Sequence, residues 1–176
     1  MMKPLRTAFV LIPLTALALS GQFVNAAQLS QAFTGNWVGT LEYKDYRNPD
    51  LRVTLPTILD VSPLGAGVKI SFTYDDGPGK TVTGEDHFTL SADGKTLDWT
   101  GVKEKTPEIF TVLSLRRDAA TRTITLVGAF EGDDNNKPAT IHETLTIGPS
   151  ELTILKEVRP TGGEFSFRHL YRMKKQ

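Results

Sequence analysis

The chain has three histidines, the side chains best suited to proton transfer or metal ligation near neutral pH. His169 lies in an alternating run and shares a face with three aromatic residues. His87 and His142 alternate with apolar neighbours, so both are expected to point away from the interior. Three histidines converging on one Zn²⁺ ion are therefore not expected. We predict that His169 is a hydrogen-bonded core or rim residue, with haem ligation as the alternative.

The carboxylates occur as adjacent pairs, Asp75-Asp76, Glu85-Asp86 and Asp133-Asp134. Adjacent residues of a strand face opposite ways, so these are poor acid–base pairs. The chain has no cysteine, which excludes disulfides and thiolate metal sites. It also has neither a Gly-x-Ser-x-Gly turn nor a His-Glu-x-x-His motif. We therefore predict that the protein is not an enzyme and has neither a metal ion nor a cofactor.

The aromatic residues are more informative, because most of them fall on predicted apolar faces. Apolar walls with a few polar groups suit a small hydrophobic or amphipathic ligand. The alternative is an interior filled by side chains with no cavity. The candidate cavity-lining residues are Tyr43, Phe72, Tyr74, Trp99, Phe130, Phe167, His169 and Tyr171.

The first 26 residues resemble a secretory signal peptide. Lys3 and Arg6 precede an apolar run over residues 7–20, and Val24-Asn25-Ala26 fits the small-x-small cleavage pattern. The apolar run is shorter than the roughly 20 residues that a membrane span needs. We predict a signal peptide over 1–26, cleavage after Ala26, and a periplasmic or secreted protein with no stable membrane span. An uncleaved N-terminal anchor is the alternative.

The remaining residues, 27–176, are predicted to form one domain. The whole chain has 20 basic and 20 acidic residues, and two of the basic ones lie in the signal, which leaves a formal charge of −2. Since there is no basic excess, nucleic acid is not an expected partner. The length suffices for a core without disulfides.

About ten short runs of alternating apolar and polar residues follow one another, which is typical of half-buried strands. Residues 28–34 could form one helical turn that caps the fold. Turn-forming residues separate the runs, and Asp93-Gly94 is the strongest two-residue hairpin signal. Long crossovers are missing, so we predict an all-β fold, an antiparallel up-and-down barrel of about 8–10 strands, rather than a Greek-key sandwich.

Gly35-Asn36-Trp37 on the first strand and Arg172 on the last resemble the calycin superfamily of lipocalins, fatty-acid-binding proteins and nitrobindin-like haem barrels. The pattern is also similar to bacterial periplasmic proteins with a lipocalin-like fold. The resemblance implies that an arginine or lysine of the last strand packs across the tryptophan. Arg172 is the first choice for this contact and Arg168 the second. Because Arg172 falls on the opposite face from Phe165, Phe167 and Tyr171, we expect a bulge or a wrong face assignment somewhere in the chain.

Three functions fit these observations. The leading hypothesis is non-enzymatic binding of a small hydrophobic or amphipathic molecule inside the barrel. The second is a structural or interaction protein of the cell envelope, or an inhibitor, that acts through loops or the outer face. The third is a haem-binding barrel that uses His169. A filled interior would contradict the first hypothesis, and unchanged haem retention in His169→Ala would contradict the third.

Overall fold

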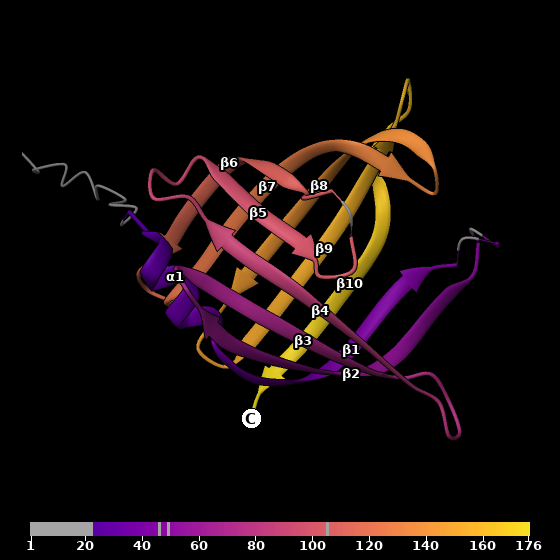
Figure 1. Cartoon of the computed structure of the whole chain (residues 1–176), viewed down its shortest axis with the longest axis horizontal. Coiled ribbons are helices and arrows are strands. Elements are labelled where there is room, and N and C mark those ends of the chain that lie inside the picture. The colour runs from indigo at the N-terminus through magenta and orange to yellow at the C-terminus, as the bar shows by residue number, and fades with distance from the viewer. Residues whose placement is uncertain (1–22, 46, 49, 105) are drawn as a thin grey trace, which may run out of the picture.

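Ten antiparallel strands close into one barrel, at the upper end of the predicted strand number. The computed structural model describes residues 23–45, 47–48, 50–104 and 106–176, so most of the predicted signal lies outside the described residues. Each strand pairs with its neighbours in sequence, and β1 pairs with β10 to close the ring (Figure 1). The elements are α1 (Ala26–Phe33), β1 (Gly35–Lys44), β2 (Arg52–Leu64), β3 (Gly67–Asp75), β4 (Thr81–Leu90), β5 (Thr96–Gly101), β6 (Ile109–Asp118), β7 (Thr123–Asp134), β8 (Lys137–Ile147), β9 (Glu151–Pro160) and β10 (Ser166–Lys175).

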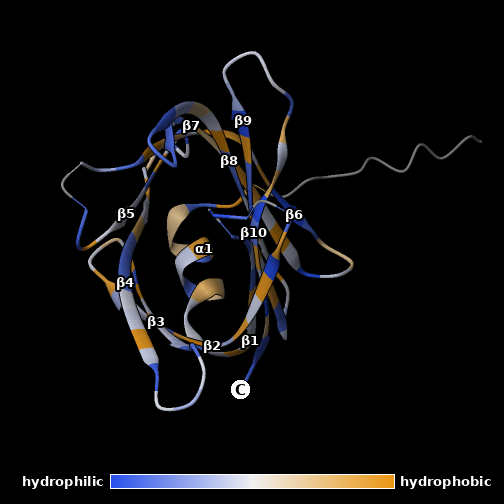
Figure 2. Ribbon diagram, turned by 90° about the vertical axis from the view of Figure 1, so that its right-hand side faces the viewer, coloured by the Kyte–Doolittle hydropathy of each residue, from blue (hydrophilic) through white to orange (hydrophobic). Residues whose placement is uncertain are grey.

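The short helix α1 lies at one end of the barrel, within the ring of strands (Figure 2). Its first turn is capped reciprocally: Asn25 Oδ1 accepts from the Gln28 backbone N–H at 2.9 Å, and Gln28 Oε1 accepts from the Asn25 N–H at 3.1 Å. Leu29 and Phe33, one turn apart, are fully buried. The helix thus starts slightly before the predicted turn. Cleavage after Ala26, which stays a prediction, would remove the capping residue.

The interior next to α1 is a tightly packed apolar core. Phe33 meets Phe88 edge to face with ring centroids 5.4 Å apart, and Phe88 meets Trp99 in the same way at 5.2 Å. Trp37 is fully buried, and its indole Nε1 donates to the Phe33 carbonyl oxygen at 2.9 Å. This end therefore buries large aromatic rings and gives the one polar atom of Trp37 a partner.

Two hairpins, β2–β3 and β7–β8, have two-residue turns, and neither is at the position that the sequence favoured. Strand β7 ends at Asp134 and β8 begins at Lys137, so Asn135-Asn136 forms a two-residue turn. Both asparagines have positive φ, 52° and 58°, as a type I′ hairpin requires. Asp93-Gly94 does lie in a hairpin, between β4 and β5, but its loop spans residues 91–95. Asparagine tolerates positive φ well enough to replace glycine at both turn positions.

Strand β10 contains the expected irregularity. Its register against β9 shifts between Phe167, which is opposite Glu157, and His169, which is opposite Lys156. Arg168 is the extra residue of this bulge and is buried. Its Nη1 donates to the Lys44 carbonyl oxygen at 2.5 Å, and its Nε donates to Asp134 Oδ1 at 3.2 Å. The bulge reverses the alternation. Phe167 and His169, which would share one side of a regular strand, therefore face opposite sides of the wall.

A lysine, rather than Arg172, packs across Trp37. Lys175 lies opposite Trp37 in the register of β1 and β10, and its Nζ sits 5.0 Å from the ring centroid. Gly35 leaves room for this lysine, since a Cβ there would lie 2.8 Å from Lys175 Cε. The prediction for Arg172 is wrong, because that side chain is exposed and pairs with Glu42 at 3.1 Å. Arg168, the second choice, instead makes hydrogen bonds to Lys44 and Asp134 from the bulge.

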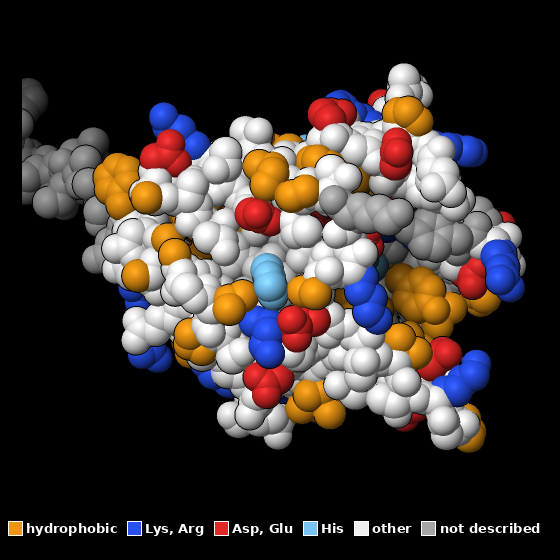
Figure 3. Space-filling model, in the orientation of Figure 1, with side chains coloured by type: hydrophobic (Ala, Val, Ile, Leu, Met, Phe, Trp, Pro, Cys, Tyr) orange, Lys and Arg blue, Asp and Glu red, His pale blue; other side chains and the backbone are white. Residues whose placement is uncertain are grey.

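The outer wall is polar. Ion pairs such as Arg52–Glu42, at 2.7 Å, and Lys69–Glu85, at 3.6 Å, lie on it. On the face that carries β3–β5, charged side chains are interspersed with single hydrophobic ones (Figure 3). Alternation along each strand therefore places most charged side chains outside and most apolar ones inside.

Candidate functional site

The barrel interior contains a cavity of about 190 Å³ on the side of the core away from α1. Its position follows from the strand register. Along β4, Phe88 packs against the α1 end, and Asp86 comes next on the same face, one step further from the helix. The apolar part of the cavity lining comes from five different strands. These residues are Phe72, Trp99, Phe110, Ile154 and Tyr171.

The rest of the lining is unusually rich in ionisable groups for a barrel interior. In the described part of the chain, four carboxyl groups, one ammonium group and one imidazole border the cavity. Two of the carboxyl groups come from the loop between β5 and β6, and the other groups come from β4, β8, β9 and β10. They are Asp86, Glu104, Glu108, Glu143, Lys156 and His169.

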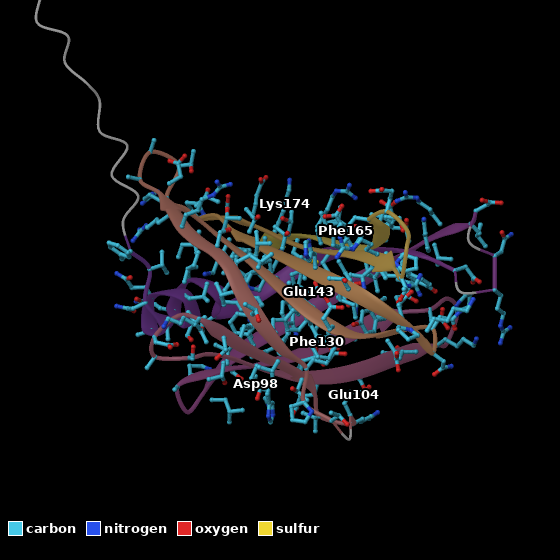
Figure 4. All side chains as sticks on the ribbon, turned by 90° about the horizontal axis from the view of Figure 1, so that it is seen from above. Asp98, Glu104, Phe130, Glu143, Phe165 and Lys174 are labelled. Carbon is cyan, nitrogen blue, oxygen red and sulfur yellow. The ribbon has the colours of Figure 1, made fainter. Side chains whose placement is uncertain are left out.

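Glu143 is the most deeply buried of these carboxyl groups. It lies on β8 between the inward-facing Ile141 and Leu145, and only 6% of it is exposed. In Figure 4 it lies between the side of the barrel that carries Phe165 and the side that carries Glu104. Burial raises the pKa of Glu143 to about 8, although the nearby Lys156 ammonium acts against this shift. Glu143 is therefore protonated in most molecules at neutral pH.

One oxygen of this carboxyl group lacks a partner. Glu143 Oε1 lies 3.9 Å from both Lys156 Nζ and His169 Nε2. Glu143 Oε2 is buried and has no hydrogen-bond partner in the structure. A buried polar atom without a partner costs about 1–3 kcal/mol, so it calls for an explanation.

His169 faces the cavity from β10, as the alternation predicted for this residue. Burial, together with the positive charges of Lys156 and Arg168, lowers the pKa of His169 well below its ordinary value. About 26% of the side chain stays accessible, which limits the effect of burial. The imidazole is neutral at physiological pH, and its ring meets Tyr171 edge to face at 5.4 Å.

Two hydrogen bonds fix the orientation of the neighbouring polar groups. The Trp99 indole Nε1 donates to Asp86 Oδ2 at 3.1 Å, and the hydroxyl groups of Tyr74 and Tyr171 are 2.8 Å apart. Burial raises the pKa of Asp86 above its ordinary value, and the bond from Trp99 opposes that shift. Burial also raises the pKa of Tyr74 to about 12, so both tyrosines are neutral donors.

The structure brings four of the eight predicted residues to the cavity: Phe72, Trp99, His169 and Tyr171. Tyr74 and Phe130 lie beside it, where Tyr74 bonds to Tyr171 and the Phe130 ring packs 5.5 Å from that of Phe110. Tyr43 is half-buried on β1, opposite His169 in the register, but outside the cavity lining.

The prediction that Phe167 lines the cavity is wrong, as is its shared face with His169. The Arg168 bulge turns Phe167 to the outer wall, where the Arg52 guanidinium lies 3.9 Å from its ring centroid. Phe165 is outside too, stacked at 4.1 Å on His142. His87 is exposed, with Glu85 3.6 Å away. Both of these other histidines lie on the outer side, where the alternation places them.

Sequence reasoning missed the charged part of the lining, although one signal was present. Glu143 interrupts an apolar face between Ile141 and Leu145, and Lys156 does the same between Ile154 and Val158. An ionisable residue on a predicted inward face is costly and indicates a specific role. Glu104 and Glu108 lie in a loop, so no such signal could have marked them.

Four hollows are larger than this cavity, at about 370, 510, 560 and 640 Å³. Exposed turns border two of them, residues 77–80 in one case and 160–163 in the other. The interior cavity is the stronger candidate because it combines aromatic walls with buried ionisable groups. Among the described residues, no group of three or more His, Cys, Asp or Glu is arranged to hold a metal ion.

Comparisons with known proteins do not assign a family. No family model matches the chain, and no curated protein matches it. One solved structure with some likeness is a Bacteroides fragilis protein described, provisionally, as an outer membrane protein. It is 12% identical, with 87% of this chain and 100% of that chain covered, and the TM-score is 0.21. A likeness at this level carries no argument about function. Within the described part of the chain, no helix is long and apolar enough to span a membrane.

Proposed function

We propose that this protein is an exported binding protein that holds a small amphipathic molecule inside its barrel without chemically changing it. The observation that carries the proposal is the interior cavity, which has aromatic groups on one part of its wall and polar groups on the other. An apolar wall with a few oriented polar groups is typical of small-molecule sites. A core selected for stability alone would fill this space with apolar side chains.

The cavity volume limits the size of the ligand. Drug-sized ligands occupy pockets of about 300–1,000 Å³. In another protein, an engineered cavity of about 150 Å³ holds benzene. The present cavity, about 190 Å³, therefore suits a ligand with one ring or a chain of similar size. A haem is larger than a drug-sized ligand, so the volume does not favour the haem hypothesis for His169.

The polar outer wall supports a protein that moves through an aqueous compartment. Charged residues such as Glu42, Arg172 and Lys69 face outward from their strands. Strands that face lipid carry a continuous apolar band instead. Together with the predicted signal peptide, this supports a location in the periplasm or outside the cell.

Filling the cavity tests the proposal. Ile154 is buried in the lining on β9, so Ile154→Trp would occupy the ligand's space. Thr153→Trp, on the outward face of the same strand, is the matched control. We expect native mass spectrometry of protein purified gently from its own host to show a retained small molecule. The mass should be present in the wild type and in Thr153→Trp, and absent from a folded Ile154→Trp.

Two negative results together would contradict the proposed function. If the wild type carries no small molecule, and a library of one-ring amphipathic compounds does not raise its melting temperature, the proposed function is wrong. The second hypothesis, an envelope interaction protein that works through its loops or outer face, would then take its place.

A further inference from the structure

The cavity has an imbalance of charge that points to the class of its ligand. Among the described residues, four carboxyl groups border it, and the only cationic side chain of the lining is Lys156. Lys156 lies close to Glu143 alone among the carboxyl groups, at 3.9 Å. His169 adds no positive charge at neutral pH because its pKa is lowered. The groups that face Glu143 from β4, β9, β10 and the β5–β6 loop thus give the described part of the lining more carboxyl groups than cationic ones.

The unpaired oxygen of Glu143 marks a position inside this acidic surrounding. Glu143 belongs to the lining, is more than nine-tenths buried, and its Oε2 accepts no hydrogen bond from any described residue. A ligand with an N–H donor would give this carboxyl group a hydrogen-bond partner and reduce the cost of its burial. A ligand with an anionic group would instead meet four carboxyl groups.

The aromatic part of the wall fits the same ligand. Phe72 and Tyr171 lie 5.8 Å apart between ring centroids, and Trp99 borders the same cavity. Aromatic faces attract cations, most strongly when the cation is removed from water, and they also cover an apolar body. The bond from Trp99 holds the Asp86 carboxyl group in place beside them.

From these observations we propose that the ligand is a small organic amine, whose ammonium group binds the Glu143 carboxylate and whose apolar body lies against Phe72, Trp99 and Tyr171. The inference rests on the proposed function and specifies the ligand of the same cavity. It names a chemical class, a protonated primary amine on a body of about one ring, which is what the volume admits.

Binding of such a cation should release a proton from Glu143. Free Glu143 is protonated at pH 7, because burial raises its pKa to about 8. An ammonium group at hydrogen-bond distance favours the ionised carboxylate. The carboxyl proton then leaves to the solvent as the ion pair forms. A neutral ligand of the same shape would release no proton.

The test uses three probes that share a phenyl ring and differ in the polar end: 2-phenylethylamine, 2-phenylethanol and phenylacetate. Isothermal titration of the exported protein at pH 7, in two buffers of different ionisation enthalpy, gives the affinity and the protons released. We expect the amine to bind at least about ten-fold more tightly than the alcohol. Phenylacetate should bind most weakly, and close to one proton should leave per amine bound.

Two variants locate the effect. Glu143→Gln keeps the shape of the side chain and cannot ionise, so it should reduce the preference for the amine to about three-fold or less and abolish proton release. Glu85→Gln is the matched control, because Glu85 is the β4 neighbour of Asp86 and faces outward. It should leave both quantities unchanged. Circular dichroism of each variant confirms that the barrel is folded.

The failure of this inference can be told apart from failure of the proposed function. If the alcohol or phenylacetate binds as tightly as the amine, or if Glu143→Gln keeps the preference for the amine, the ligand class or its position is wrong and the cavity remains a binding site. If none of the three probes binds, the amine inference is wrong, and the native mass spectrum decides independently whether the protein carries another molecule.

Discussion

The two halves of the barrel interior are built from the same strands and differ in chemistry. Next to α1, the fully buried residues Leu29, Phe33, Trp37 and Phe88 form a dry core in which the indole N–H of Trp37 has a partner. Beyond Phe88, the wall instead surrounds a cavity with Glu143, Lys156 and His169. One half resembles the core of any stable domain, and the other half does not.

The α1 half has the composition expected of residues that stabilise the fold, and the other half does not. Apolar burial stabilises the α1 half, with about 1.5–3 kcal/mol for each fully buried large side chain. A buried carboxyl group with an unpaired oxygen reduces stability, and replacing such groups by apolar ones often increases it. The polar half does not stabilise the fold in this way, which agrees with the binding role that we propose. The following variants test this contrast, from the largest expected effect to the smallest.

Truncation of a buried side chain in the α1 half should have the largest effect on stability. Phe33→Ala removes a fully buried ring that packs against Phe88, so we expect a loss of about 3–5 kcal/mol in the free energy of unfolding. Urea unfolding measures it. Leu113→Ala, at a position that is 54% exposed, is the control and should change stability by less than about 0.5 kcal/mol. A loss below about 1 kcal/mol for Phe33→Ala would mean that α1 is not part of the core.

Glu143 should make the protein less stable as the pH rises. Its pKa is near 4.5 unfolded and about 8 folded, so the folded state holds the proton more tightly. This contribution is fully present below about pH 4.5 and is lost as the pH rises through 8. We expect the free energy of unfolding to fall by a few kcal/mol between about pH 5 and pH 9. Unfolding in urea at several pH values measures the slope.

Glu143→Gln should flatten this slope, whereas the outward-facing Glu85→Gln should retain it. At about pH 9 the Glu143→Gln protein should be the more stable of the two, because it no longer buries a negative charge. An identical slope in both variants would show that Glu143 is ionised at neutral pH in the folded protein.

His169 should act in the opposite direction and by less. Its pKa is lowered on folding, so its contribution is present above about pH 6.5 and is lost as the pH falls below that value. His169→Gln should improve stability near pH 4 relative to the wild type, on the order of 1 kcal/mol, since part of the ring is accessible. Thermal unfolding across pH measures this. His87→Gln, on the outer wall, should not change the acid side of the profile.

The hydroxyl pair in the cavity wall should give the smallest effect. Tyr74→Phe and Tyr171→Phe each remove one member of a 2.8 Å hydrogen bond, and each should cost about 0.5–1.5 kcal/mol. The double variant should cost less than the sum of the two, since one bond is lost in either case. Tyr43→Phe, outside the cavity lining, is the control. Additive losses would show that the two hydroxyl groups do not act as a pair.

The sequence by itself determined the wall of the barrel. Alternation gave the strands and their inward residues, such as Ile141 and Leu145 on β8, because a period of two follows from backbone geometry alone. Short turns and the lack of crossovers gave the up-and-down order. Four of the candidate cavity residues also followed, because the predicted inward face held wherever no bulge intervened.

The tertiary structure decided which residues share the cavity. The bulge at Arg168 turned Phe167 outward and left His169 inside, and Arg168 is held by groups 34 and 124 residues away, on Asp134 and Lys44. Closure of β1 on β10 placed Lys175, rather than Arg172, on Trp37. Asp86, Glu143 and Lys156 meet because their strands curve around one axis. Local pattern carries no information on such distances, since register and closure are set by pairings between residues far apart in the chain.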